Sequence, residues 1–362
     1  MTNEDWTFFR NQLLSWYEPE RRPMPWKEIR DPYRIWLSEI ILQQTRVEQG
    51  RPYFERFVEA YPTVNNLAAA EDDAVMKLWE GLGYYSRARN LLRAARMVAG
   101  EFGGTFPNTY RELRALPGVG PYTAAAIASF AFDEQVAVLD GNVYRILARF
   151  AGDVTPIDTG RGRQSFQALV DQALGDAPAR RFNQAIMDFG ALVCTPKRAD
   201  CGACPLNERC RALAEGKVYG LPVKSKKLKR TTRHFHYLVV ENDAGLTLIE
   251  QRTARDIWQD LYQFPLVESD REGLLPADLA GENTWPKQLP AAELEYLKSS
   301  PPYRHQLTHQ TIVVRFHRFR WAGLDGYRGE GFMVTDQELR TYAFPRVITR
   351  FLDDNSLLLD LY

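Results

Sequence analysis

The chain has 362 residues, 45% of them hydrophobic and 25% charged, which is long enough for two folded domains and excludes a mainly disordered protein. Its 46 basic and 46 acidic residues cancel, so it is not a uniformly basic binder of nucleic acid. No secretory signal opens the sequence and no run approaches the ~18–20 apolar residues of a membrane span, so we expect a cytoplasmic protein without a membrane partner.

Residues 1–215 show the periodicity of helices. Apolar residues recur at helical spacing over 6–17 and over 91–98, where Ser86 can cap the second helix and Gly103-Gly104 can end it. Strand-like alternation is scarce in this part of the chain. Further helices are expected over 141–150, 163–174 and 179–192.

The next segment, 216–233, contains seven basic residues and no acidic one, with Gly and Pro among them. It is typical of a basic interdomain linker that could touch a polyanion, and a solvated linker without a partner explains it equally well. Beyond it, β-rich runs divided by turn residues are found over 236–241, 246–250 and 311–320.

These patterns predict an architecture of two unequal domains. A mainly α domain over 1–215 precedes the linker, and a smaller α+β domain occupies 234–362. A closing helix is expected over 336–343.

All four cysteines lie in one segment of seventeen residues, Cys194-x6-Cys201-x2-Cys204-x5-Cys210. Disulfides are a poor interpretation in a chain without an export signal. Four thiolates from one short loop suit either zinc or a [4Fe-4S] cluster, because both accept four sulfur ligands. The spacing alone leaves this choice open.

A second motif, Leu116-Pro117-Gly118-Val119-Gly120, lies between two helical patterns. The two glycines that flank Val119 allow a tight hairpin with positive φ. Exposed N–H groups at the start of the next helix would bind a nucleic-acid phosphate without reading the base sequence. An ordinary turn between helices is the alternative.

The hairpin, the cysteine loop and the segment Val138-Leu139-Asp140-Gly141-Asn142-Val143 together resemble the helix–hairpin–helix DNA glycosylases of the endonuclease III superfamily. Ser38-Glu39-Ile40-Ile41-Leu42-Gln43-Gln44-Thr45 and Gly81-Leu82-Gly83-Tyr84-Tyr85 narrow the resemblance to the MutY family of adenine DNA glycosylases. It covers essentially the whole chain.

This resemblance implies a helix–hairpin–helix glycosylase domain followed by a Nudix-like domain. It also implies a base excision repair enzyme that removes adenine mispaired with 8-oxoguanine or guanine in duplex DNA. In the family the cysteines, here Cys194, Cys201, Cys204 and Cys210, hold a [4Fe-4S] cluster, which favours the cluster over zinc.

Cleavage of the N-glycosidic bond would fall to two carboxyl groups, Glu39 and Asp140. Glu39 lies in an apolar stretch, where burial would raise its pKa and suit an acid that protonates adenine N7. Asp140 would stay ionised beside the sugar C1′, as electrostatic stabiliser or transient nucleophile. As the family implies, Asn142 and Tyr122 would position these groups. Unaided by the resemblance, Glu39 would be a solvent-facing carboxylate and Asp140 a helix N-cap.

Tyr122 also bears on the reaction class. Bifunctional relatives such as endonuclease III have a lysine at this position, which forms a Schiff base that leads to strand cleavage. A tyrosine cannot do so. We therefore expect a monofunctional glycosylase that leaves the abasic strand intact.

The target adenine must leave the base stack before a pocket can engage it. The family positions that line the adenine pocket correspond to Arg22, Trp26, Lys27 and Gln184. Lys27 stands where Arg is common, and an ammonium cannot make a bidentate contact. Near the opposing base, the family has two residues that wedge into the helix, which correspond to Gln44 and Tyr84. Two others touch 8-oxoguanine and correspond to Thr45 and Leu82.

Residues 234–362 resemble the Nudix-like domain that reads 8-oxoguanine. They lack the Arg-Glu-x-x-Glu-Glu run of a Nudix hydrolase, so we expect recognition rather than hydrolysis. Leu307-Thr308-His309 stands where the family usually has Phe-Ser-His, so Thr308 and His309 would read the lesion, although a surface β-turn is the alternative. All five His lie in this part, so none serves catalysis in the helical domain.

Two other functions fit parts of the sequence. One is an endonuclease III-like lyase for damaged pyrimidines, which Tyr122 and the second domain disfavour. The other is a non-catalytic iron–sulfur or zinc DNA-binding protein, or an electron carrier. The leading prediction is a monomeric, nucleoid-associated adenine glycosylase.

Overall fold

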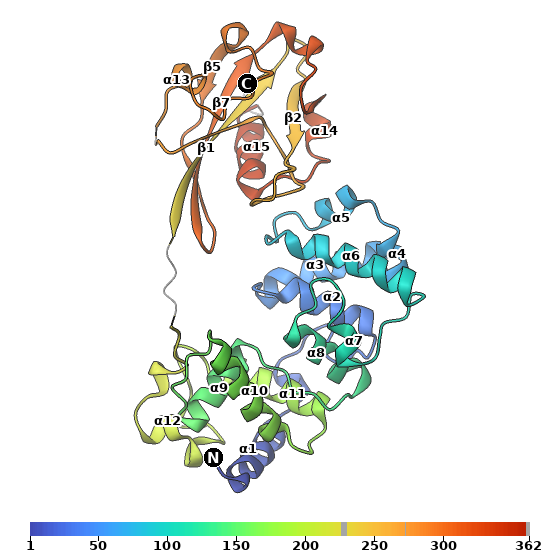
Figure 1. Cartoon of the computed structure of the whole chain (residues 1–362), viewed down its shortest axis with the longest axis vertical. Coiled ribbons are helices and arrows are strands. Elements are labelled where there is room, and N and C mark those ends of the chain that lie inside the picture. The colour runs from blue at the N-terminus through green and yellow to red at the C-terminus, as the bar shows by residue number, and fades with distance from the viewer. Residues whose placement is uncertain (226–229, 272, 360–362) are drawn as a thin grey trace. The chain divides into compact units, whose positions relative to one another are not determined.

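The computed structural model describes residues 1–225, 230–271 and 273–359 (Figure 1). The chain divides into two compact units, one made of Met1–Ala70 and Asn90–Lys227, the other of Glu71–Arg89 and Leu228–Tyr362. Residues 226–229 of the expected basic linker lie outside the described residues. None of the helices in the described ranges combines the length and apolar character that a membrane span requires.

The first unit is built from helices. Polar side chains accept the free N–H groups at several helix starts, as Thr2 does for α1 and Thr159 for α10. The helices are α1 (Asn3–Trp16), α2 (Pro32–Leu42), α3 (Val47–Ala60), α4 (Val64–Ala68), α7 (Tyr110–Leu113), α8 (Pro121–Phe132), α9 (Gly141–Ala151), α10 (Gly160–Leu174), α11 (Ala179–Leu192), α12 (Arg211–Ala214) and most of α6 (Ser86–Glu101).

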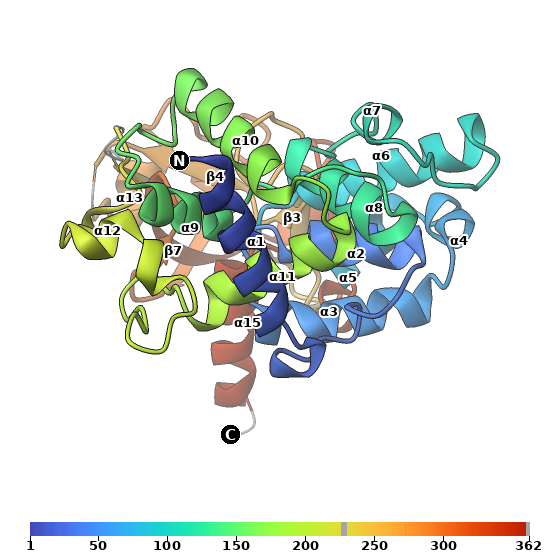
Figure 2. The same cartoon turned by 90° about the horizontal axis from the view of Figure 1, so that it is seen from below.

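These helices form two groups that meet where α8 packs on α11. In one group α2 packs on α3 and α8, and in the other α9 packs on α10, α11 and α12. Helix α1 runs beside α11 in both views (Figures 1 and 2). Helix α8 is buried over most of its length, from Thr123 to Phe130, so it forms the centre of the unit.

The expected helices agree closely with those observed in this unit. Helix α11 has the expected bounds, and α10 begins three residues early because Thr159 caps it. Helix α6 begins at Ser86 itself, so Ser86 is its first residue rather than its cap. It ends before Gly103 and Gly104, whose φ angles of 61° and 80° suit a glycine stop.

The second unit contains an eight-stranded sheet in the order β3-β2-β1-β7-β5, with β4 beside β1, β6 beside β7 and β8 beside β2. Strands β1 and β7 run parallel and the other pairs are antiparallel. The strands are β1 (Thr231–Glu241), β2 (Thr247–Gln251), β3 (Tyr262–Gln263), β4 (Leu266–Ser269), β5 (Glu295–Ser299), β6 (Tyr303–Gln306), β7 (Gln310–Arg320) and β8 (Phe332–Val334).

Besides the first turn of α6, the described residues of this unit form the helices α5 (Asp72–Leu78), α13 (Pro276–Leu279), α14 (Asp336–Leu339) and α15 (Arg346–Leu359). The expected helix over 336–343 is wrong in extent, because only α14 forms. The β-branched Thr341 and the approach to Pro345 disfavour a continued helix, and the Ala343 carbonyl instead accepts from the Tyr262 N–H. The closing helix is α15, whose Phe351 stacks on Phe316 of the sheet.

Candidate active site

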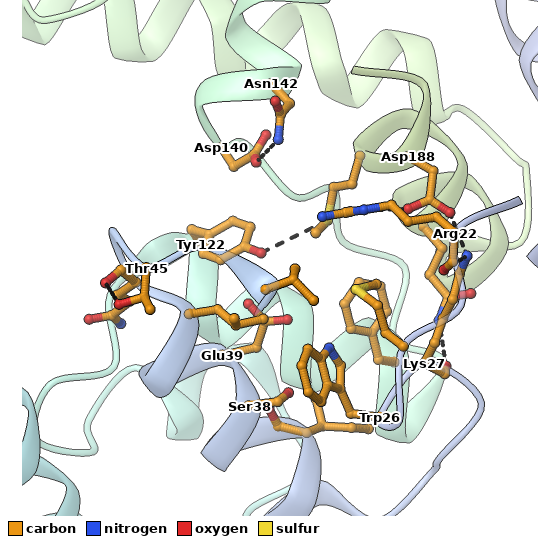
Figure 3. A pocket seen from close by; sticks show the side chains of 18 of the residues that line it. Arg22, Trp26, Lys27, Ser38, Glu39, Thr45, Tyr122, Asp140, Asn142 and Asp188 are labelled. Atoms are coloured by element: carbon orange, nitrogen blue, oxygen red, sulfur yellow. Dashed lines mark hydrogen bonds and ion pairs between the residues drawn. The ribbon is translucent and has the colours of Figure 1, made fainter. Parts of the chain in front are cut away.

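A cavity of about 510 Å³ lies in the first unit, where the two helix groups meet (Figure 3). This volume lies within the range of small-molecule sites. Its walls come from α2, α8, the start of α9, α11 and the segment 22–27. The cavity brings together all eight residues that the sequence assigned to catalysis and adenine binding: Glu39, Tyr122, Asp140, Asn142, Arg22, Trp26, Lys27 and Gln184.

Glu39 lies within α2, which is buried from Ile35 to Ile41, and its side chain is 7% exposed. Burial raises the pKa of Glu39 to about 7, and the Asp140 carboxylate adds to the rise. The Tyr122 hydroxyl and Arg22 act in the opposite direction. Glu39 therefore carries a proton in a large fraction of molecules at neutral pH, as a general acid must.

Asp140 is the N-cap of α9 and also a wall of the cavity. Its carboxylate accepts from the Val143 N–H and from Asn142 Nδ2, both at 2.8 Å. Burial raises the pKa of Asp140, while these hydrogen bonds and the charge of Arg145 favour the ionised form. The cavity thus holds two carboxyl groups in unlike surroundings, and the proton is better placed on Glu39.

Tyr122 is the second residue of α8 and places its hydroxyl beside Glu39, 3.9 Å from Met187 Sδ (Figure 3). Burial raises its pKa well above the usual value, so it stays neutral. The phenol can donate one hydrogen bond but cannot form a Schiff base.

Lys27 is the one amine among the described residues that line the cavity. Its Nζ donates to the Pro19 and Arg22 carbonyls, at 2.8 and 3.1 Å, and to Asp188 Oδ2 at 2.5 Å. An ammonium has three donors, and all three are used inside the protein. Lys27 therefore forms the wall and offers no further N–H to a base.

Asp188 is a cavity residue that the sequence analysis missed. It is 2% exposed and its other oxygen accepts from Arg22 at 3.2 Å. The available signal was its position on α11, one turn beyond Gln184 and therefore on the same helix face. Gln184 is itself oriented, because its Oε1 accepts from Tyr17 and its Nε2 donates to the Lys27 carbonyl.

Behind Asp140, a chain of hydrogen bonds leads to the cysteine loop. Asn142 Oδ1 accepts from Arg145 Nη2 at 2.8 Å, and Arg145 Nε donates to the Cys194 carbonyl at 2.7 Å. Arg145 Nη2 also donates to the Gly190 carbonyl at 2.8 Å. Asp140 is thus connected through Asn142 to Arg145, Gly190 and Cys194, which do not line the cavity.

Gly190→Ala tests this connection. A Cβ at position 190 would lie 2.6 Å from the Asn142 Cβ, so either α9 or Asn142 must shift. We expect the rate of the reaction at this site to fall by roughly 10–100-fold, since small displacements of reacting groups have effects of this size. Single-turnover kinetics would measure it, with Gly160→Ala as the control because a Cβ there meets nothing within 4 Å. An unchanged rate would show that this close approach is not needed.

The four cysteines are half-buried in one loop, where Cys194 acts electrostatically on each of the other three. Arg149 Nη1 lies 3.3 Å from Cys194 Sγ and also donates to the Thr195 carbonyl. Within the described residues, no three His, Cys, Asp or Glu side chains converge tightly enough for a single metal ion. A [4Fe-4S] cluster does not require such convergence, because each thiolate binds a different iron atom.

The hairpin between α7 and α8 is formed as the sequence predicts, with one difference. Gly118 has a φ of 76°, and a Cβ there would meet Asn90 at 2.7 Å. Gly120 has a φ of −79°, so the expectation of positive φ is wrong at this glycine. The Val119 N–H donates to the Leu116 carbonyl, and a Cβ at Gly120 would meet nothing within 4 Å.

The residues expected near the opposing base fall into two places. Gln44 and Thr45 line the first cavity. A second cavity of about 440 Å³, in the second unit, is lined by residues that include Leu82, Tyr84, Thr308 and His309. There the Tyr84 hydroxyl and Thr308 Oγ1 are hydrogen-bonded at 2.5 Å.

Comparisons with known proteins agree with this architecture. Two family models match: the HhH-GPD superfamily of base excision DNA repair proteins over residues 37–169, and the NUDIX domain over 236–354. The solved structure of a thermostable thymine-DNA glycosylase matches with a TM-score of 0.55 at 28% identity, over 59% of this chain and 98% of that one. A trapped endonuclease III–DNA covalent intermediate matches with a TM-score of 0.52 at 20% identity, over 60% and 99%, which shows a shared fold.

Similar curated proteins carry one name. "Adenine DNA glycosylase" of Buchnera aphidicola subsp. Schizaphis graminum is 37% identical over 258 residues, which are 71% of this chain and 74% of that protein. The Homo sapiens protein of the same name is 42% identical over 234 residues, 60% of this chain and 43% of its own length. The expected fold class, a helical glycosylase domain before a Nudix-like α+β domain, is confirmed. The chain belongs to the adenine DNA glycosylase family, within the helix–hairpin–helix superfamily of base excision repair proteins.

Proposed function

We propose that this protein hydrolyses the N-glycosidic bond of adenine mispaired with 8-oxoguanine or guanine in duplex DNA, as the first step of base excision repair. One observation carries the proposal. In a single cavity, a carboxyl group with a pKa raised to about 7, Glu39, faces a second carboxyl, Asp140, that hydrogen bonds hold in place. The relatives' printed name supplies the base, adenine.

The two carboxyl groups divide the chemistry. Glu39 donates its proton to N7 of the extruded adenine, so that the base leaves as a neutral molecule with the bonding electrons. The Asp140 carboxylate faces the positive charge that develops at C1′, as an ion or through a transient covalent bond. Asn142 fixes the Asp140 oxygen to which it donates, and water completes the hydrolysis.

The remaining cavity residues recognise the base. Gln184 keeps one N–H and one oxygen lone pair unused by Tyr17 and Lys27, which is the complement of an adenine edge. Arg22 is tied to Asp188 and lies beside the same space. Trp26 offers an aromatic wall that is itself fixed edge-on against Phe54, with ring centroids 5.0 Å apart.

Contacts to DNA come from several segments. The Gly118-Val119-Gly120 hairpin precedes α8 and binds a backbone phosphate at the N-terminus of this helix, where Gly120 presents no side chain. Gln44 and Tyr84 enter the duplex, Thr45 and Leu82 border the opposing base, and Thr308 with His309 reads 8-oxoguanine. Solved endonuclease III structures that match this fold are DNA complexes by their titles, which supports binding to double-stranded DNA. The enzyme acts as a monomer on nucleoid DNA.

Cys194, Cys201, Cys204 and Cys210 hold a [4Fe-4S] cluster. The donor set fits, because four thiols gather in one half-buried loop beside the cations of Arg145 and Arg149. When bound, the cluster supplies four iron–sulfur bonds that fix the loop. Arg149 connects that loop to α9 through the Thr195 and Pro196 carbonyls.

Purified protein on 30-base-pair duplexes tests the proposal, with adenine opposite 8-oxoguanine, guanine, thymine or cytosine. We expect alkali-labile abasic sites with the first two partners, and intact strands when alkali is omitted, because Tyr122 provides no amine. Borohydride should trap no stoichiometric complex. Strand cleavage without alkali, or untouched adenine opposite 8-oxoguanine, would refute the proposed activity.

A further inference from the structure

The loop 81–84, which we call the wedge loop, has an unusual backbone. Gly81, Gly83 and Tyr84 have φ angles of 86°, 77° and 49°. The left-handed region costs a non-glycine residue such as Tyr84 about 1–2 kcal/mol. Tyr84 is also 46% exposed, so core packing does not fix its ring. The hydrogen bond to Thr308 Oγ1 restrains the hydroxyl end of the ring, so a further interaction must hold the backbone conformation.

Arg87 supplies backbone contacts to the wedge loop from the first turn of α6. Its Nη2 donates to the Gly83 carbonyl at 3.0 Å and to the Leu82 carbonyl at 3.4 Å. Its own N–H donates to the Tyr84 carbonyl at 2.9 Å. The Trp79 indole N–H shares the Gly83 carbonyl at 3.1 Å. Arg87 thus binds the carbonyls of three successive loop residues: those of Leu82 and Gly83 through its side chain, and that of Tyr84 through its backbone N–H.

The Arg87 guanidinium also contacts two aromatic rings. Its Cζ lies 5.0 Å from the Trp79 ring centroid and 5.6 Å from that of Tyr84, within the range of a cation–π interaction. The side chain is only 7% exposed, so little water screens these contacts. Burial lowers the pKa of Arg87 to about 10, which leaves the group charged at neutral pH.

We propose that Arg87 is a positioning residue, which sets the direction in which Tyr84 leaves the protein surface toward DNA. The inference rests on the proposed function, because it takes Tyr84 as a side chain that enters the duplex. Arg87 acts through the wedge loop alone, because its hydrogen bonds fix the loop carbonyls and its cation–π contact fixes the Tyr84 ring. Its removal then matters only while Tyr84 is present.

A double-mutant cycle tests this directly. With an A:8-oxoguanine duplex, Arg87→Met is expected to lower the single-turnover rate of adenine release by roughly tenfold, the equivalent of one desolvated cation–π contact. In a Tyr84→Ala background the same substitution should change the rate by less than about twofold, since coupled residues are not additive. Arg93→Met, exposed on the same helix, is the matched control and should leave both rates unchanged.

A second measurement does not depend on glycosylase activity. Hydrogen exchange of the free protein should be faster in peptides covering 81–85 for Arg87→Met, and unchanged for Arg93→Met. Arg87→Lys covers the case in which the methionine variant does not fold. It keeps the charge but loses the planar fork, so its exchange and rate should lie between those of the wild type and Arg87→Met.

The outcomes separate this inference from the proposed function. An inactive wild type would remove the function, while the exchange data would still decide whether Arg87 orders the wedge loop. With an active wild type, an equal penalty in both backgrounds would assign Arg87 a general structural role and overturn the inference. Unchanged exchange at 81–85 would overturn it as well.

Discussion

Glu39→Gln is expected to reduce single-turnover release of adenine by roughly 10³-fold, the middle of the range for loss of a general acid. The substitution keeps the size and hydrogen-bonding shape of the side chain but removes the proton that adenine N7 must receive. Binding of the duplex should persist, since Glu39 lies inside the cavity with 7% exposure and contributes no charge to the DNA surface. Alkaline cleavage assays and fluorescence anisotropy would measure the two quantities.

The pH profile gives the same residue a second test. Because the acid form of Glu39 is the active one, and its pKa lies at about 7, the wild-type rate should fall as pH rises above 7. The slope should approach tenfold per pH unit. Asp140→Asn is the matched comparison: its residual activity should keep this alkaline limb, whereas that of Glu39→Gln should lose it. A wild-type rate that stays flat from pH 6 to 9 would contradict the assignment.

The raised pKa of Glu39 also means that the fold loses stability as pH rises from acid to alkaline values. A carboxyl group whose folded pKa exceeds the unfolded value of 4.5 stabilises the fold below 4.5, and this contribution is lost as pH rises to about 7. A shift of this size corresponds to about 3 kcal/mol. Glu39→Gln should therefore be more stable than the wild type at pH 8, by up to that amount in urea unfolding, and lose this advantage near pH 4.5.

The sequence predicted those features that depend on local chemistry. The burial of Glu39 could be predicted because six apolar residues flank it within α2, whereas its catalytic role came from the family resemblance. The local sequence could identify Asp140 only as the N-cap of α9, and the family resemblance supplied its catalytic role. The cysteine loop is contiguous, so its composition alone pointed to iron or zinc. In each case a few neighbouring residues contain the signal.

What the sequence did not predict depends on packing between distant segments. Asp188 on its own helix resembles a surface carboxylate, and only the approach of Arg22 and Lys27 buries it. Two loop carbonyls accept hydrogen bonds from the Lys27 ammonium, and no sequence motif identifies them. The full use of its N–H groups could therefore not be predicted. The same holds for Arg87, whose partners are carbonyl groups and rings. Backbone acceptors leave no trace in a side-chain pattern, so such contacts require coordinates.

A pair of buried histidines in the second unit should make that unit sensitive to acid. His236 on β1 and His317 on β7 are 2% and 0% exposed, and their Nδ1 and Nε2 atoms are 3.0 Å apart. His317 Nδ1 is hydrogen-bonded to Ser299 Oγ at 2.7 Å. In the described part of the chain, His236 Nε2 has no partner. A proton added here would place a charge among buried groups, where burial and the Arg315 charge outweigh the opposing effect of the Glu282 carboxylate on His236.

Burial lowers the pKa of both histidines to about 4, and the charge of Arg315 acts in the same direction. The unfolded chain takes up these protons near pH 6.5, so stability is fully present above 6.5 and falls as pH drops to about 4. One such group corresponds to about 3 kcal/mol across this interval. Urea unfolding between pH 7 and 4.5 would measure the loss, with hydrogen exchange in β1 and β7 peptides reporting on this unit.

The double substitution His236→Leu with His317→Leu separates this pair from the carboxylates that also titrate in acid. Leucine keeps a similar volume and removes both the titration and the unsatisfied nitrogen, so the variant should lose less stability than the wild type between pH 7 and 4.5. His234→Leu, on the same strand but half-exposed, should retain the wild-type slope. Parallel slopes in all three proteins would mean that the pair stays neutral for a reason other than burial, or takes up its protons without unfolding the sheet.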